Sequence, residues 1–275
     1  MPRKTQIRDC VPHLTLFDDV FFRKAAEDLD FCQEFVETCL EDLTIKVKTN
    51  LPQVELLNLQ GRSAIIDLIC SLGDERKVIV EIQKRHVKDH IRTARYNTAL
   101  VTVDTTDPGE DTSNITDVIL IYVTKGDLFG YGKTKYVVKR TIANIGKAID
   151  DGEVMIFINA KVNDGSRISH LMQIFLGDKQ FLNEFPKIHN RIKQLLETEK
   201  GIEEMSTLYE QYFSDEWNEN QAQWKKKEDE WKSEKAEWEK KDAMRNKTEE
   251  ELRKQVDALK KDNEELKRCL QDAKK

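Results

Sequence analysis

The sequence predicts an α/β domain, in which helices flank a central mixed sheet, followed by a long C-terminal coiled-coil helix. Three observations favour this fold class. Short apolar runs rich in Ile and Val, bounded by Gly, Asp and Pro, are typical of strands. Helical periodicity fills the segments between these runs. From residue 201 onward Glu and Lys dominate, so we place the boundary between two domains there, at 1–200 and 201–275.

Within residues 1–200, strand-like runs separated by helices and polar loops suit a mixed sheet covered by helices. The first helical region carries apolar residues at helical intervals, with a break expected around Asp28–Asp30. The expected elements are a helical region 14–43, an extended stretch 45–60, a hairpin 64–83, a helix from about 84 to 102, a polar loop 104–116, a strand 117–124, a strand or helix start 134–141, a strand 153–160, and helices 168–176 and 181–199.

The hairpin carries one carboxylate in each of its apolar strands. Asp67 in AIIDLIC and Glu81 in VIVEIQ lie equally far from Asp74, so a hairpin centred on Asp74 places them nearly opposite one another. Side chains alternate between the faces of a sheet. Asp67, Glu81 and Gln83 are therefore expected on one face. The other face is expected to hold Ile66, Leu68, Val78, Val80 and Ile82.

Two carboxylates side by side on a mostly buried sheet repel each other and are poorly solvated, so they share a proton or bind a cation. Carboxylate oxygens suit hard ions such as Mg²⁺ or Mn²⁺. The Ile82 carbonyl offers another oxygen, and Gln83 can orient a water molecule. The residues alone leave a second interpretation open, namely a half-exposed sheet with two ordinary surface carboxylates.

A cationic stripe follows the hairpin at helical spacing. Such a stripe, leaving an acidic strand, suits contact with the phosphates of a phosphodiester substrate, although a solvated helix face is the common alternative. His86 and His90 share this segment, and without a further ligand they are interpreted as solvent-facing. The stripe consists of Lys84, Lys88, Arg92 and Arg95.

Three motifs together carry a resemblance to a known family. They are D-x(13)-E-x-Q on the hairpin, RTARYNTAL in the following helix, and FDDVFFRKAAED upstream, with Asp19, Phe22 and Arg23 at the matching positions. With these motifs the chain resembles the PD-(D/E)XK nuclease superfamily, and within it the recombination-promoting nuclease (Rpn) and transposase-like branch. The resemblance covers about residues 14–185.

The resemblance implies a restriction-endonuclease-like core, metal-dependent hydrolysis of DNA and a role in recombination. It assigns Asp67 and Glu81 as metal-binding carboxylates, and Asp19 as a further candidate ligand. Gln83 matches the position where the wider superfamily usually has lysine. Arg23 would join the cationic stripe in holding DNA phosphates. The alternatives are an inactive nuclease fold that binds DNA and a protein that acts mainly through its coiled coil.

Charge, cysteine content and apolar runs argue against several classes of function and location. The net charge of −6 is distributed over both domains, which argues against a high-affinity non-specific DNA binder. The cysteines are scattered and form no CxxC pair, which favours a reducing cytoplasm and no zinc site. The first ten residues lack the apolar core of a secretory signal, and the longest apolar run, 118–123, is too short to span a membrane.

The C-terminal domain shows a heptad pattern. Four tryptophans recur every seven residues, and three leucines continue the same register. A second heptad position, four residues after each leucine, completes the pattern. An Asn at that second position favours a parallel dimer. Stacking of the tryptophans on DNA bases is the less favoured alternative. The positions are Trp217, Trp224, Trp231, Trp238, Leu252, Val256, Leu259, Asn263, Leu266 and Leu270.

Overall fold

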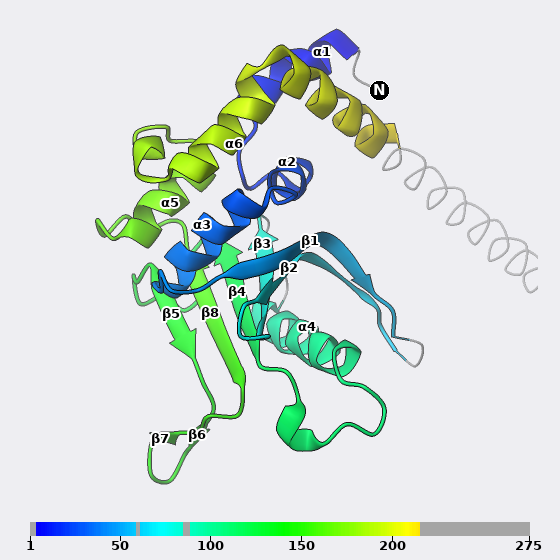
Figure 1. Cartoon of the computed structure of the whole chain (residues 1–275). Coiled ribbons are helices and arrows are strands. Elements are labelled where there is room, and N and C mark those ends of the chain that lie inside the picture. The colour runs from blue at the N-terminus through cyan, green and yellow to red at the C-terminus, as the bar shows by residue number, and fades with distance from the viewer. Residues whose placement is uncertain (1–3, 59–60, 85–88, 215–275) are drawn as a thin grey trace, which may run out of the picture. The chain divides into compact units, whose positions relative to one another are not determined.

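The computed structural model describes residues 4–58, 61–84 and 89–214 (Figure 1). The chain divides into two compact units, Met1–Tyr212 and Phe213–Lys275. The first unit extends past residue 200, because the helical residues 199–212 pack on it through the buried Met205. The coiled-coil positions from Trp217 to Leu270, together with His86 and Lys88, lie outside the described residues.

A mixed six-stranded sheet forms the centre of the first unit. Strands β3, β4 and β8 run parallel, whereas β1, β2 and β5 pair antiparallel with their neighbours. The α/β architecture with a mixed sheet flanked by helices is therefore confirmed. In spatial order the strands are β1 (Val47–Leu56), β2 (Ala64–Leu72), β3 (Lys77–Gln83), β4 (Val118–Thr124), β8 (Glu153–Asn159) and β5 (Lys135–Val138). A separate two-stranded sheet pairs β6 (Thr141–Ile142) with β7 (Lys147–Ala148).

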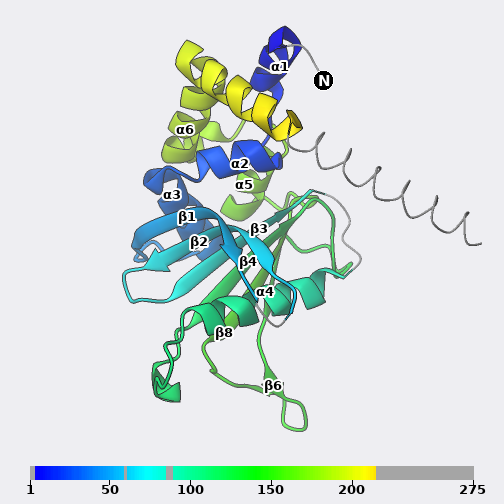
Figure 2. The ribbon, with the colours of Figure 1, turned by 90° about the vertical axis from the view of Figure 1, so that its right-hand side faces the viewer.

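Helices cover both faces of the sheet unequally (Figures 1 and 2). One face is covered by α2 (Asp19–Ala25), α3 (Leu29–Leu40), α5 (Arg167–Phe175) and α6 (Pro186–Glu197). The other face is covered by α4 (His90–Asp104). The remaining short helices are α1 (Lys4–Cys10), η1 (Val11–His13), η2 (Thr112–Asn114) and η3 (Leu182–Glu184). Within the described part of the chain, no helix combines the length and apolarity needed to cross a bilayer.

Local sequence explains where several helices begin. The carboxylate of Asp28 accepts the amide N–H of Phe31 and caps α3, so the predicted break at this point is confirmed. Asp89 caps α4 in the same way through the amide of Arg92. The prediction that this helix starts near Lys84 was wrong. Pro186 occupies the first turn of α6, where a missing N–H costs nothing, so the predicted helix 181–199 is divided.

Two residues of the hairpin depart from the predicted faces, Ile66 and Asp67. Asp67 was expected to share a face with Glu81, but it lines a pocket with Ile82 on the side of α2, whereas Glu81 bonds Asn97 on α4. Leu68, Val80 and Ile82 belong to the core under α2, α3, α5 and α6, as expected, but Ile66 belongs to the core under α4. At the same level of the neighbouring strand β1, Gln53 has φ 53° between the pairs Pro52↔Leu68 and Val54↔Ile66. A left-handed residue interrupts the pleat and changes which face the following side chains take. The interruption falls opposite Asp67.

Candidate functional site

The two strands of the hairpin separate at Asp67. The ladder between β2 and β3 ends at Leu68↔Val80, although both strands continue beyond this pair. The next position in the same register would set Asp67 opposite Glu81. There Asp67 Oδ2 accepts the backbone N–H of Ile82 at 2.7 Å, so a carboxylate replaces the carbonyl partner that a continued ladder would supply. The split end of the hairpin thus sets Asp67 near enough to Glu81 for its charge to act on that carboxyl group.

Glu81 is buried, with 3% of its surface exposed. Its Oε1 accepts a hydrogen bond from Asn97 Nδ2 on α4 at 2.9 Å, and the side chain of Gln83 also hydrogen-bonds it. Neither Glu81 nor Asp67 forms an ion pair with a Lys or Arg among the described residues. The pair is therefore held by neutral donors, and no basic side chain in the described part of the chain pairs with it.

Burial and the charge of a neighbouring carboxylate raise the pKa values of Asp67 and Glu81. Burial raises the pKa of Asp67 to about 6, and the nearby charge of Asp19 acts in the same direction. The pKa of Glu81 lies well above its ordinary value because of burial and the neighbouring Asp67, although the bonds from Asn97 and Gln83 oppose this. Such a pair retains a proton near neutral pH or gains stability from a bound cation.

A pocket of about 250 Å³ opens beside Asp67, on the side of α2. Asp19, the first residue of α2, lines it together with Arg23 one turn later on the same helix. The guanidinium of Arg23 donates to Gln53 Oε1 across the pocket. Ile82 also lines the pocket. The predicted residues Asp19, Arg23, Asp67 and Ile82 therefore meet at one opening.

The donor chemistry of this site fits a hard divalent cation. No three His, Cys, Asp or Glu side chains in the described part of the chain are grouped so as to hold a metal ion. Mg²⁺, however, is commonly bound by one or two carboxylates, with waters and substrate phosphates completing its shell. Asp67 and Glu81, with the Ile82 carbonyl between Glu81 and Gln83, are the residues that would supply oxygen ligands of this kind.

A buried polar network continues from Glu81 towards α4. Tyr122 on β4 is the register partner of Glu81 on β3, and its hydroxyl lies 3.0 Å from His90 Nδ1. Burial raises the pKa of Tyr122, and the charges of Glu81 and Asp67 raise it further. His90 is only 8% exposed, so the prediction of a solvent-facing histidine was wrong. Asn97 and Tyr122 were missed by sequence reasoning, because each lies in an ordinary apolar or amphipathic run.

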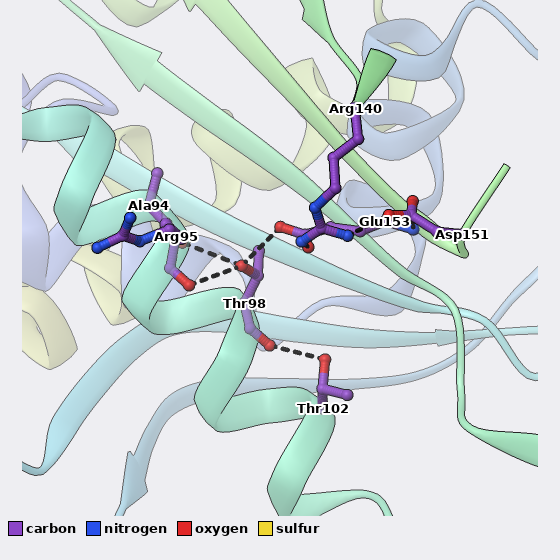
Figure 3. Close-up of polar contacts among 7 residues, drawn as sticks. All are labelled: Ala94, Arg95, Thr98, Thr102, Arg140, Asp151 and Glu153. Carbon is purple, nitrogen blue, oxygen red and sulfur yellow. Dashed lines mark hydrogen bonds and ion pairs between the residues drawn. The ribbon is translucent and has the colours of Figure 1, made fainter. Parts of the chain in front are cut away.

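A cluster midway along α4 ties this helix to β8 (Figure 3). Thr98 Oγ1 donates to Glu153 Oε1 at 3.0 Å, and Arg140 pairs with both Glu153 and Asp151. Thr98 follows Asn97 directly, so the bond to β8 holds the part of the helix that presents Asn97 to Glu81. We interpret the cluster as a positioning contact.

The predicted cationic stripe is only partly formed. Lys84 follows the end of β3 instead of lying on α4, and its Nζ pairs with Asp18. Burial opposes the pKa shift of Asp18, but hydrogen bonds from Lys84 and Thr15 hold that pKa below its usual value. Arg92 and Arg95 are exposed on α4, and Arg92 pairs with Asp89. One helix therefore carries Arg92 and Arg95, while Lys84 belongs to the strand end.

Comparisons of the chain with protein-family models, with curated proteins and with solved structures found no match.

The raised pKa of Asp67 predicts a pH dependence of stability. The unfolded carboxyl loses its proton near pH 4 and the folded one near pH 6. The folded state therefore holds more protons in this window, and the free energy of unfolding falls as pH rises through it. The expected loss is at most about 3 kcal/mol. Urea denaturation of wild type and Asp67→Asn from pH 4 to 7, without divalent cations, measures it. Parallel curves for the two proteins would contradict the assignment.

Proposed function

We propose that the protein is a metal-dependent DNA endonuclease of the Rpn and transposase-like type, with a restriction-endonuclease-like core. The observation that supports the proposal best is the split hairpin end. It holds the half-buried Asp67 beside the strand that carries the buried Glu81, neither acid has a basic partner among the described residues, and Gln83 hydrogen-bonds Glu81. Acids whose pKa values are raised by burial and by a neighbouring carboxylate are costly to a fold, and such groups are concentrated at functional sites.

In the proposed mechanism, Asp67, Glu81 and the Ile82 carbonyl offer oxygen ligands to Mg²⁺ or Mn²⁺. When bound, the ion supplies Lewis-acid activation of water and charge stabilisation at phosphorus. Asn97 holds the Glu81 carboxylate in place, and the Ile82 amide holds that of Asp67. The amide of Gln83 aligns the attacking water.

Basic side chains around the site are proposed to bind the DNA backbone. The DNA backbone is held by Arg23 at the pocket and by Lys84 at the strand end, with Arg92 and Arg95 on α4 and Lys88 in the segment between. Asp19 faces the same pocket and adds a further carboxylate near the metal ligands. A parallel dimer formed through the C-terminal coiled coil would carry two such centres, an arrangement suited to cutting both strands.

Incubation of supercoiled plasmid with the full chain tests the proposal. We expect nicked or linear product with Mg²⁺ or Mn²⁺, and no product when EDTA removes the cation. Thermal unfolding provides a second readout, because a bound ion should raise the melting temperature of wild type but not of Asp67→Asn. Intact plasmid over a wide range of enzyme and both cations would contradict the enzymatic proposal.

A second candidate function is an inactive nuclease fold that binds DNA. The observation favouring it is that hydrogen bonds from Asn97 and Gln83 already occupy Glu81, and Gln83 brings no positive charge. DNA binding that persists in EDTA, without cutting in any divalent cation, would support this candidate.

A further inference from the structure

Two lysines emerge side by side at the carboxyl end of the parallel strands. Gln83 on β3 is the register partner of Thr124 on β4, and these are the last residues of their strands. The next residues along the chain are Lys84 and Lys125. Neighbouring strands lie about 4.8 Å apart, so the two lysines leave adjacent points of one sheet edge. Ligands of open α/β sheets bind at this edge.

The two lysines have different surroundings. Lys84 Nζ is paired with Asp18, as described above. Lys125 Nζ instead lies over the ring of Phe17, 5.1 Å from its centroid, and the side chain is exposed. No carboxylate pairs with Lys125 among the residues that the structure describes. The ring of the buried Phe17 therefore holds a cation in place without neutralising it.

Lys125 lines a second pocket, of about 270 Å³, which is distinct from the one beside Asp67. Gln83, Lys84 and His90 also line it, so it adjoins the candidate metal ligands through Gln83. A Cβ added at Gly126 would meet no atom within 4 Å, which leaves open space over the backbone there. Two lysines and an open glycine backbone make this pocket suitable for an anion.

The acidic residue that lines this pocket, Asp127, accepts hydrogen bonds from its own loop. Asp127 accepts the backbone N–H groups of Phe129, Gly130 and Gly132 and the hydroxyl of Tyr136. These donors hold the pKa of Asp127 below its usual value against the opposing effect of burial. The carboxylate of Asp127 is therefore stabilised by its own loop and does not pair with Lys125. Lys125 can then bind an anionic ligand.

We propose that Lys125 is a substrate-positioning residue that binds the backbone phosphate next to the scissile one. The cut strand would then pass from the Asp67 pocket across Gln83 into the pocket of Lys125. This inference rests on the proposed nuclease function and adds a contact outside the predicted cationic stripe. The phosphate would contact both Lys125 and Lys84. Lys84 would then share its charge between the phosphate and Asp18.

Three variants of the full chain test this contact. Lys125→Met removes the charge, Lys125→Arg retains it, and Lys139→Met removes an exposed lysine just beyond β5 as a matched control. Binding to a fluorescein-labelled DNA duplex is measured by anisotropy in Ca²⁺ at several salt concentrations. We expect Lys125→Met to weaken binding roughly tenfold and to reduce the salt slope by about 1. Lys125→Arg should restore both values, and Lys139→Met should change neither.

Chemical modification of the DNA locates the contact. Once the cut has been mapped on a short duplex, a neutral methylphosphonate replaces the phosphate on either side of it. One replacement should slow cleavage by wild type and leave the already slower Lys125→Met unchanged. If Lys125→Met and Lys139→Met give equal affinities and salt slopes, the inference is wrong even where wild type cuts DNA. If wild type binds DNA through Lys125 but cuts nothing, the nuclease proposal fails instead.

Discussion

Replacing Asp67 by Asn is expected to reduce metal-dependent DNA cleavage by about a thousandfold or more, with no loss of stability at pH 7. The amide keeps the shape of the carboxyl group, and its oxygen can still accept the N–H of Ile82. It removes the negative charge that would hold the cation. Because burial raises the pKa of Asp67, removing this charge also relieves a cost of folding.

Glu81→Gln should have a similar effect for the same reason. The new side chain can still accept the hydrogen bond from Asn97 while losing its charge. The double variant should be little slower than either single variant, because two ligands of one ion act as a unit and their effects are not additive.

Asp74→Asn provides the matched control. Asp74 lies in the turn of the same hairpin, its side chain is 54% exposed, and it pairs with Arg76. Plasmid cleavage rates in Mg²⁺ and Mn²⁺ are compared for the two single variants, the double variant and Asp74→Asn after circular dichroism confirms folding. Cleavage by Asp67→Asn at the rate of Asp74→Asn would exclude Asp67 as a metal ligand.

The hairpin and its two acids could be predicted because the relevant signals are local. The turn around Asp74 and the alternation along β2 and β3 specify the register, and the register sets Asp67 opposite Glu81. The position of Ile66 could not be predicted in the same way. The irregularity lies where β2 pairs with β1 around the left-handed Gln53, and nothing in the sequence of the hairpin indicates it.

The partners of the acids were harder to predict because they come from distant segments. Asn97 contacts Glu81 only because α4 packs on the sheet, and the bond from Thr98 to Glu153 helps to fix it there. His90 is buried because Tyr122, on a strand that follows later in the chain, offers its hydroxyl. Helical spacing in the sequence placed Lys84 in the predicted cationic stripe. In the structure Asp89 caps α4, which begins at His90, so Lys84 is not on this helix. Periodicity describes one element at a time, and these contacts join several.

Phe22→Ala is expected to lower the free energy of unfolding by about 4 kcal/mol. Phe22 is 2% exposed and packs against three other rings, those of Phe31, Phe35 and Phe175, with centroid distances of 6.1–6.2 Å. Truncation removes these contacts and leaves a cavity that neighbouring rings on α3 and α5 cannot easily fill. Phe181→Ala, at a partly buried ring stacked on His170, should cost clearly less.

The same substitution tests how far the site depends on the core beneath α2. Phe22 lies between Asp19 and Arg23 on this helix, and all three residues line the Asp67 pocket. Urea denaturation followed by circular dichroism measures stability, and plasmid cleavage well below the unfolding midpoint measures the site. We expect Phe22→Leu to retain most of the stability and to cleave faster than Phe22→Ala. Equal unfolding midpoints for Phe22→Ala and Phe181→Ala would show that the aromatic cluster does not anchor α2, and the placement of Asp19 would then need another cause.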